Sequence, residues 1–200
     1  MASTGSLRDA GHEIAPRYTA SEREALLEVA RRSIAQGVET GRPLAVDPTR
    51  HSAPLRALRA SFVTLRRGGE LRGCVGDLVA SRPLVVDVAE NAYKAAFRDS
   101  RFSPLRADEL PGLEIHLSVL GPMERLSVSS EADLIRELRP GIDGLSLACG
   151  SLRATFLPAV WASLPEPAQF VSELKRKAGL PGEMWSPDFE LERYTTESIE

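Results

Sequence analysis

Two strand-like pairs joined by glycine turns constrain the fold of this chain more than any other feature. Gly68-Gly69 joins residues 60–66 to 71–78, and Gly150 joins residues 142–149 to 151–156. Glycine supplies the positive φ that a tight hairpin turn requires. Hairpins interleaved with helical segments indicate an α+β protein and exclude a doubly wound parallel sheet.

Apolar residues at helical spacing mark the segments around these hairpins. Thr19-Ala-Ser-Glu22 is a capping box, which predicts a helix that ends near Gly37. Many glycines and prolines in residues 37–56 indicate an extended surface loop. Apolar and polar residues alternate over residues 113–120, which predicts a strand with one polar face. Further helices are expected over 84–97, over 130–138, from Pro158 and over 165–178, with a last strand over 189–194.

Length and composition bound the domain organisation. Two hundred residues, 42% of them hydrophobic, are enough for one substantial domain or for two small lobes. Residues 1–17 are polar and aperiodic, which indicates a flexible N-terminal tail. We therefore expect one domain over residues 18–198, built as a single unit or as two interlocked lobes, with a mixed or antiparallel sheet against packed helices.

The net charge and the positions of cysteine and histidine limit which partners and metal sites are expected. The net charge of −3 disfavours nucleic-acid binding, which usually needs a basic surface. No stretch approaches eighteen consecutive apolar residues, so no membrane span is expected. Cys74 and Cys149 form no CxxC pair, and the three histidines are scattered. These features predict a cytoplasmic protein with reduced thiols, no metal site and no cofactor.

The densest chemical signal is the segment Leu71-Arg72-Gly73-Cys74-Val75-Gly76-Asp77. A regular strand places Arg72, Cys74 and Gly76 on one face, where the guanidinium would favour the thiolate. Gly73 and Gly76 leave space for a ligand or for another backbone. Asp77 is predicted to orient Arg72 or to accept a substrate proton, although a bulge at either glycine would change its face. The alternative is a cysteine that simply packs, as buried free cysteines usually do.

Other candidate residues lie outside this hairpin. Arg101 follows the helix expected over 84–97, either as a cap of its C-terminus or as a ligand-binding group. Asp143 and Gly144 stand at a strand entry, where Asp-Gly is usually a turn signal but can hold a ligand. His116 is expected on the polar face of its strand without a catalytic role, because no carboxylate partner is evident. Cys149 alternates with Leu147 and Leu145 and is interpreted as a packed residue.

Five motif blocks in order resemble the AMMECR-one domain family, which includes system protein A of the AmmeMemoRadiSam set. Each block is weak alone, but five in register over roughly residues 18–198 are specific. The resemblance implies an α+β fold with a larger and a smaller lobe, and the six-residue motif near their junction. It also implies two partners, a MEMO-type protein and a radical SAM enzyme, but no assigned reaction. The blocks are Leu71–Gly76, Asp99–Leu105, Gly141–Leu145, Ala154–Val160 and Lys177–Leu180.

Three functions follow from these observations. The first is an accessory component of an AmmeMemoRadiSam-type system with a ligand or catalytic site at the hairpin. The second is a small cytosolic enzyme in which Cys74 is a thiol nucleophile and Arg72 binds an anionic group of the substrate. Asp77 or Asp143 would orient the reacting groups. The third is a nucleic-acid-associated regulatory protein, which the net charge disfavours. The absence of a histidine placed to activate the thiol weighs against the enzyme.

Overall fold

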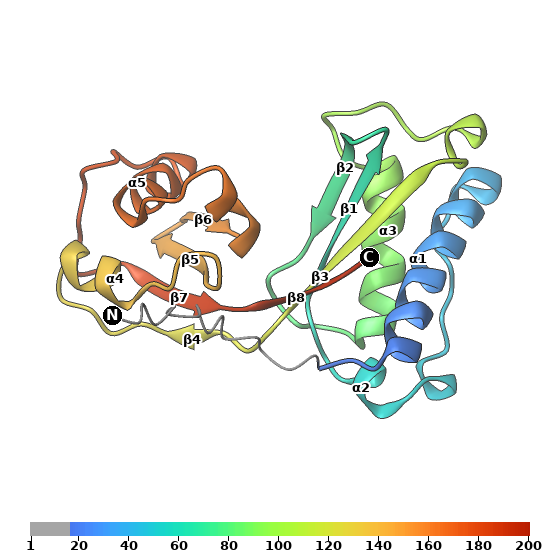
Figure 1. Cartoon of the computed structure of the whole chain (residues 1–200), viewed down its shortest axis with the longest axis horizontal. Coiled ribbons are helices and arrows are strands. Elements are labelled where there is room, and N and C mark those ends of the chain that lie inside the picture. Colours follow the sequence, from blue (N-terminus) through green and yellow to red (C-terminus); the bar gives the residue numbers. More distant parts are fainter. Residues whose placement is uncertain (1–16) are drawn as a thin grey trace, which may run out of the picture.

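Two four-stranded antiparallel sheets divide the described residues, 17–200, into a larger and a smaller lobe in the computed structural model (Figure 1). The larger sheet has the strand order β2-β1-β3-β8, and the smaller has the order β4-β7-β5-β6. The α+β class with two lobes that the sequence predicts is therefore confirmed. The predicted tail lies outside the described residues except for Arg17, whose backbone N–H donates to Glu197 at 2.7 Å.

The larger lobe pairs its sheet with two long helices on one face. The helices are α1 (Ala20–Thr40) and α3 (Leu84–Phe97), and the strands are β1 (Ser61–Arg67), β2 (Glu70–Gly76), β3 (Leu113–Leu120) and β8 (Thr196–Ile199). Three short helices connect them: η1 (Pro48–Arg50), α2 (Ala53–Arg56) and η2 (Ala107–Glu109). The predicted capping box is present, because Thr19 and Glu22 each bond to the other's backbone N–H.

Alternation along the strands decides which face of the larger sheet is covered. Val63 and Leu65 of β1 are fully buried and pack with Leu117 of β3 against α1 and α3. Small alanines such as Ala92 let α3 lie close to the sheet. The alternate residues, including Thr64, point to the opposite face, which no helix of this lobe covers and which faces the smaller lobe (Figure 1).

The smaller lobe packs two helices against its own sheet. Its elements are β4 (Glu124–Arg125), α4 (Glu131–Glu137), β5 (Gly144–Cys149), β6 (Leu152–Phe156), η3 (Pro158–Ala162), α5 (Pro167–Lys177) and β7 (Glu190–Tyr194). Trp161 and Phe170 stack at 3.8 Å between ring centroids in its core. Cys149 packs against this core, as its alternation with Leu147 predicts.

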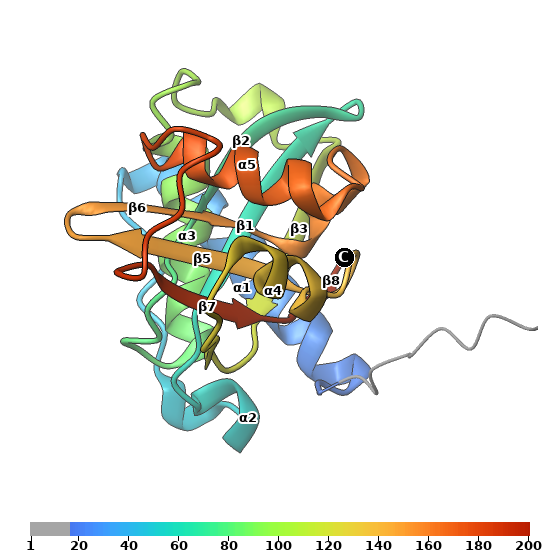
Figure 2. The same ribbon diagram turned by 90° about the vertical axis from the view of Figure 1, so that its left-hand side faces the viewer.

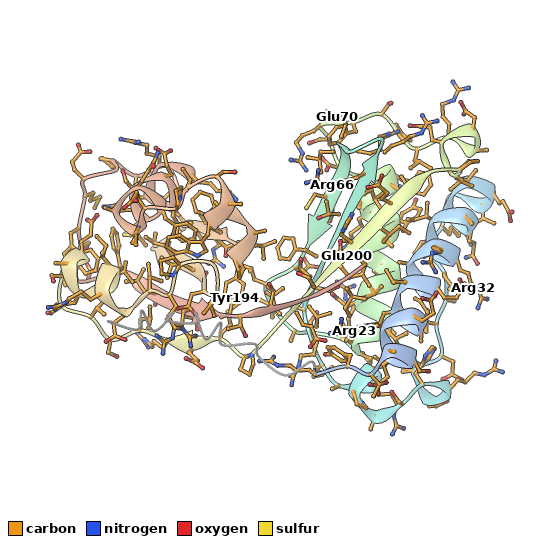
Figure 3. The ribbon with its side chains drawn as sticks, in the orientation of Figure 1. Arg23, Arg32, Arg66, Glu70, Tyr194 and Glu200 are labelled. Atoms are coloured by element: carbon orange, nitrogen blue, oxygen red, sulfur yellow. The ribbon has the colours of Figure 1, made fainter. Side chains whose placement is uncertain are left out.

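The smaller lobe is an insertion between two neighbouring strands of the larger sheet. The chain leaves the larger lobe after β3 through residues 121–123 and returns through Thr195, directly before β8. Gly121 N–H donates to the carbonyl oxygen of Thr195 at 2.8 Å, which ties the two crossings together. Tyr194 is buried at this junction with Ala60 and Leu120 (Figure 3). The two lobes are thus interlocked by topology.

Two local expectations need correction. Residues 37–56 are not one extended loop, because α1 continues to Thr40 and two short helices follow. Gly37 is retained inside α1 since a Cβ there would lie 2.3 Å from the ring of Phe97. The strands β4 and β8 were not predicted, as both are short and carry charged residues. In the described part of the chain, no helix is long and apolar enough to cross a membrane.

Candidate functional site

A cleft of about 660 Å³ lies between the open face of the larger sheet and the smaller lobe. Figure 2 looks from the smaller-lobe side and shows α5 in front of β1 and β2. Gly76 and Phe62 line the cleft from the larger lobe, and Thr155 and Lys177 line it from the smaller lobe. The cleft therefore brings together side chains from segments about a hundred residues apart.

Cys74 is not among the residues that line this cleft, but it lies on the same strand as Gly76, which does. Cys74 is two residues before Gly76 on β2 and is partly exposed. Its Sγ is 3.3 Å from Oγ1 of Thr64, the residue directly opposite on β1. Its backbone N–H donates to Oδ2 of Asp99 at 2.9 Å. The thiol is thus held at an exposed position by a strand and by the loop after α3.

Arg101 is the guanidinium beside the hairpin cysteine. It donates to both carboxylate oxygens of Asp99, at 2.9 and 2.7 Å, and its Nη2 donates to the carbonyl oxygen of Cys74 at 3.3 Å. This hydrogen-bonded guanidinium holds the pKa of the Asp99 carboxyl well below its usual range. The Asp99 side chain is 6% exposed, whereas that of Arg101 is 55% exposed. Arg101 is therefore fixed on one side and open to solvent on the other.

Lys177 brings a second positive charge from the other lobe to the cleft beside the hairpin. Its Nζ donates to the carbonyl oxygen of Thr155 at 3.0 Å and lies 5.1 Å from the ring centroid of Phe156. Partial burial lowers the pKa of Lys177, Cys74 acts in the opposite direction, and Arg101 lowers it further. The charge of Lys177 thus interacts with both Cys74 and Arg101, although they belong to the larger lobe.

Arg72 does not serve as the predicted partner of the thiol. Leu65 pairs with Gly73 and Arg66 with Leu71, so Arg72 has no partner on β1 and occupies a β-bulge. Its Nε and Nη2 donate to the carboxylate of Glu109 at 2.7 and 3.0 Å. The regular strand assumed from the sequence is interrupted at this residue, and the guanidinium binds η2 instead.

Asp77 forms ion pairs within the protein, and the two glycines of the hairpin pack closely against other protein atoms. Asp77 accepts from Nη2 of Arg82 at 2.9 Å and lies 3.7 Å from Nζ of Lys94, so it does not orient Arg72. A Cβ on Gly73 would lie 2.1 Å from the carbonyl oxygen of Ala95 in α3. A Cβ on Gly76 would lie 2.4 Å from the Phe62 ring. The glycines allow close approach of protein atoms, and Gly76 alone of the two lines the cleft.

Asp143 and Gly144 form a structural turn. The Asp143 side chain is fully buried and accepts from the backbone N–H of Arg139 at 2.9 Å and from its Nη2 at 2.6 Å. A Cβ on Gly144 would lie 2.6 Å from the Tyr194 ring. This arrangement matches the turn interpretation and leaves the Asp143 carboxylate no surface for a ligand.

Comparison with known proteins places this geometry in a family. The family model for AMMECR1 matches residues 27–199. The chain belongs to the AMMECR1 family. A protein from Methanothermobacter thermautotrophicus is 34% identical over 177 residues, covering 86% of this chain and 91% of the relative. A protein from Aeropyrum pernix is 37% identical over 182 residues, covering 86% and 75%.

A solved structure confirms the fold of this AMMECR1 protein. The crystal structure of uncharacterised protein PH0010 from Pyrococcus horikoshii matches with a TM-score of 0.79 and 30% sequence identity. The match covers 86% of this chain and 88% of that chain. The resemblance drawn from the five motif blocks is therefore confirmed, both in sequence and in fold.

Three of the five AMMECR1 motif blocks meet at the thiol. Cys74 comes from the first block, Asp99 and Arg101 from the second, and Lys177 from the last. Sequence reasoning named Lys177 and Asp99 only as matches to the family motifs, without a role in the site. Their positions in the family motifs were the only sequence signal that pointed to them. The motifs come together only because the smaller lobe lies over the open face of the larger sheet.

One further residue on the open sheet face was not expected to take part. His116 of β3 has a carboxylate partner, because its Nδ1 lies 2.8 Å from Oε2 of Glu200. That partner follows β8, a strand that was not predicted. Among residues 17–200, no group of three or more His, Cys, Asp or Glu side chains is arranged to hold a metal ion.

Proposed function

We propose that this AMMECR1 protein binds a small anionic substrate at the junction of its lobes and uses Cys74 as a thiol nucleophile toward it. One observation carries this proposal: Arg101 donates to the backbone carbonyl oxygen of Cys74, and Lys177 of the other lobe lines the cleft that Gly76 of the same hairpin also lines. Two positive charges near a partly exposed thiol attract an anion to the same place.

The two cations suit different parts of such a substrate. Nη1 of Arg101, which takes no part in the bonds to Asp99 and Cys74, can donate to a carboxylate or phosphate, and Lys177 adds a point charge from across the cleft. We propose addition of the thiol to a carbonyl carbon of the bound anion. The sulfur forms the new C–S bond, the π electrons move to the carbonyl oxygen, and that oxygen receives one proton for the one that the thiol gives up to the protein. Nothing leaves in this step, so atoms and charge balance.

Selective alkylation tests the anion site without knowledge of the substrate. Iodoacetate and iodoacetamide differ by one charge, and mass spectrometry can give the rate constant of each at Cys74. We expect the ratio of the iodoacetate rate to the iodoacetamide rate to be about tenfold higher at Cys74 than at glutathione, because cationic clefts concentrate anions. Lys177→Gln and Arg101→Gln should each lower this ratio several-fold.

A matched control removes the same charge elsewhere. Lys94→Gln deletes a lysine of α3 that lies near Asp77, and it should leave the ratio unchanged. A ratio at Cys74 equal to that of glutathione would contradict the proposal. So would a ratio that Lys94→Gln lowers as much as Lys177→Gln does, since the effect would then reflect overall charge.

We further propose that the protein acts within an AmmeMemoRadiSam-type system, beside a MEMO-type protein and a radical SAM enzyme. Its membership in the family supports this placement, and apolar side chains exposed near the cleft offer a contact surface. Val79 lines the cleft and is 73% exposed, and Leu58, on a segment that pairs with Pro83, is 54% exposed. Exposed apolar side chains of this kind often mark protein contacts.

Binding between purified proteins tests this partnership. Titration calorimetry with each partner from the same organism should show a complex that Val79→Asp weakens by tenfold or more. Leu152→Asp, at a 40% exposed residue of the smaller lobe, is the control and should bind normally. Absence of any complex with either partner would refute the partnership and leave the thiol proposal standing.

A further inference from the structure

One row of side chains crosses the open face of the larger sheet and includes the thiol. Cys74 on β2 is directly opposite Thr64 on β1, and Thr64 is directly opposite His116 on β3. Residues that are directly opposite in neighbouring strands place their side chains on the same face. Because Val63, Leu65 and Leu117 face the helices, the row faces the smaller lobe.

The distances along this row place a hydroxyl between the thiol and the imidazole. Neighbouring strands are about 5 Å apart, so the backbones of Cys74 and His116 are separated by about 10 Å, which is too far for direct contact. Thr64 occupies the strand between them, and its Oγ1 is already 3.3 Å from the Cys74 sulfur. A hydroxyl can donate and accept at once, which suits it to pass a proton between two neighbours.

His116 is positioned as the far end of the row. Its Nδ1 lies 2.8 Å from Oε2 of Glu200, which directly follows β8 and lies beside the middle of the larger sheet (Figure 3). Its Nε2 is buried and has no hydrogen-bond partner among residues 17–200. A buried imidazole nitrogen without a partner is unusual, since buried polar atoms nearly always have one. A carboxylate on one ring nitrogen and a free second nitrogen is the arrangement of an oriented general base.

We infer that Thr64, His116 and Glu200 form a proton relay that activates Cys74. This inference rests on the proposed function of Cys74 as a nucleophile. Nε2 of His116 makes no hydrogen bond to the described residues in this structure, so the relay requires it to meet the Thr64 hydroxyl as the sulfur attacks. The thiol proton then passes to Oγ1 of Thr64, and the Thr64 hydroxyl proton passes to Nε2 of His116. Glu200 stabilises the resulting imidazolium. Cys74 is then the catalytic residue, and the other three act through it.

Several charged groups surround the row Cys74, Thr64 and His116, and they come from different elements of the fold. The thiol is next to Arg101 and Asp99 of the loop after α3, and it interacts with Lys177 of α5. The imidazole is next to Glu200, after β8, and Nε2 is 3.9 Å from Oε2 of Glu114 on its own strand. The cations act on the thiolate from one side, whereas the relay removes its proton from the other.

The pH profile of alkylation separates the relay from the anion site. The rate of Cys74 alkylation by iodoacetamide, a neutral reagent, is measured from pH 5 to 10 on the full chain. Thr64→Val keeps the shape of the side chain but removes the hydroxyl, and His116→Gln removes the base. Each should lower the rate at pH 7 about tenfold and move the profile to higher pH, because general-base assistance is worth that much or more.

Two further variants make the test specific. Thr64→Ser keeps a hydroxyl and should restore most of the rate. The double variant Thr64→Val with His116→Gln should be no slower than either single one, because both interrupt the same path. Glu200→Gln should shift the profile in the same direction as His116→Gln.

Failure of the relay and failure of the proposed function have different signatures. An unchanged profile in His116→Gln would overturn the relay, even if Thr64→Val alters it through the direct contact with sulfur. In that case the iodoacetate preference at Cys74 would persist, because it depends on Arg101 and Lys177. Loss of that preference with a normal relay would instead overturn the anion site.

Discussion

Arg72 and Glu109 form a two-pronged ion pair, with Nε and Nη2 2.7 and 3.0 Å from the two carboxylate oxygens. Both side chains are largely buried, at 14% and 15% exposure. Arg72 also donates from Nη2 to the carbonyl oxygen of Ser103 at 3.0 Å. The pair thus joins the bulge of β2 to η2 and to the loop that carries Asp99 and Arg101. Its role is to hold the position of the site.

Replacing Glu109 with glutamine should reveal this role through pH. The hydrogen-bonded Arg72 lowers the pKa of Glu109 from 4.5 to about 2. Because the pKa is lower in the folded state, the stabilisation is complete above pH 4.5 and is lost as the pH falls toward 2. At pH 7, Glu109→Gln should therefore cost about 1–3 kcal/mol in free energy of unfolding. Urea titrations at several pH values should show the difference from wild type shrinking below pH 4.5.

An exposed acidic residue nearby is the control for this prediction. Asp108 pairs with Arg106 at 3.1 Å, but their side chains are 70% and 79% exposed. Asp108→Asn should cost less than about 1 kcal/mol, as exposed ion pairs usually do. Equal costs for the two variants would show that Arg72 and Glu109 add nothing beyond a surface ion pair.

Gly73 should tolerate no side chain, because α3 occupies the space. A Cβ at Gly73 would lie 2.1 Å from the Ala95 carbonyl oxygen, and that backbone atom cannot move without shifting the helix. We expect Gly73→Ala to cost about 3 kcal/mol, at the upper end for overpacking. Gly68→Ala, at φ 57° in open space, should cost about 1 kcal/mol from the left-handed conformation alone. Chemical denaturation that ranks the two in the opposite order would show that α3 adapts.

Much of the fold could be predicted because it depends on local sequence signals. The Thr19 capping box, the glycine turns and the strict alternation of 113–120 each specify an element within one segment. The strand β8 could not be predicted, because its residues Thr196–Ile199 become a strand only by pairing with β3. In the chain, the whole smaller lobe separates these two strands.

The candidate site was predictable in part for the same reason. Cys74 was found because its motif is contiguous, but the guanidinium beside it belongs to Arg101 and not to Arg72. The β-bulge at Arg72 depends on pairing with β1, which no period-two pattern reports. Lys177 and Glu200 come from the other lobe and from the end of β8, so only tertiary structure brings them to the open sheet face.

Asp143→Asn should weaken the fold and leave the thiol site intact. The fully buried carboxylate has Arg139 as its partner on both the backbone and the side chain. The Arg139 side chain is 48% exposed and stays solvated, so we expect a loss of about 1–3 kcal/mol from the weakened hydrogen bonds to the buried group. Thermal or urea unfolding measures the loss, and alkylation of the folded fraction checks the site. A normal stability with a changed iodoacetate preference at Cys74 would restore a ligand-binding role for Asp143.

Tyr194→Phe should show how the junction of the lobes responds to alkaline pH. The buried Tyr194 hydroxyl lies 2.6 Å from Oγ1 of Thr155 and donates to the carbonyl oxygen of Phe156 at 3.2 Å. Its loss should cost about 1 kcal/mol at pH 7. Burial raises the pKa of Tyr194 from 10.0 to about 12. A raised pKa means that the stabilisation is complete below pH 10 and is lost as the pH rises toward 12. The advantage of wild type over Tyr194→Phe should therefore shrink or reverse above pH 10, as measured by urea unfolding of both proteins. A constant difference across that range would mean that the phenol ionises as easily in the folded chain as in the unfolded one.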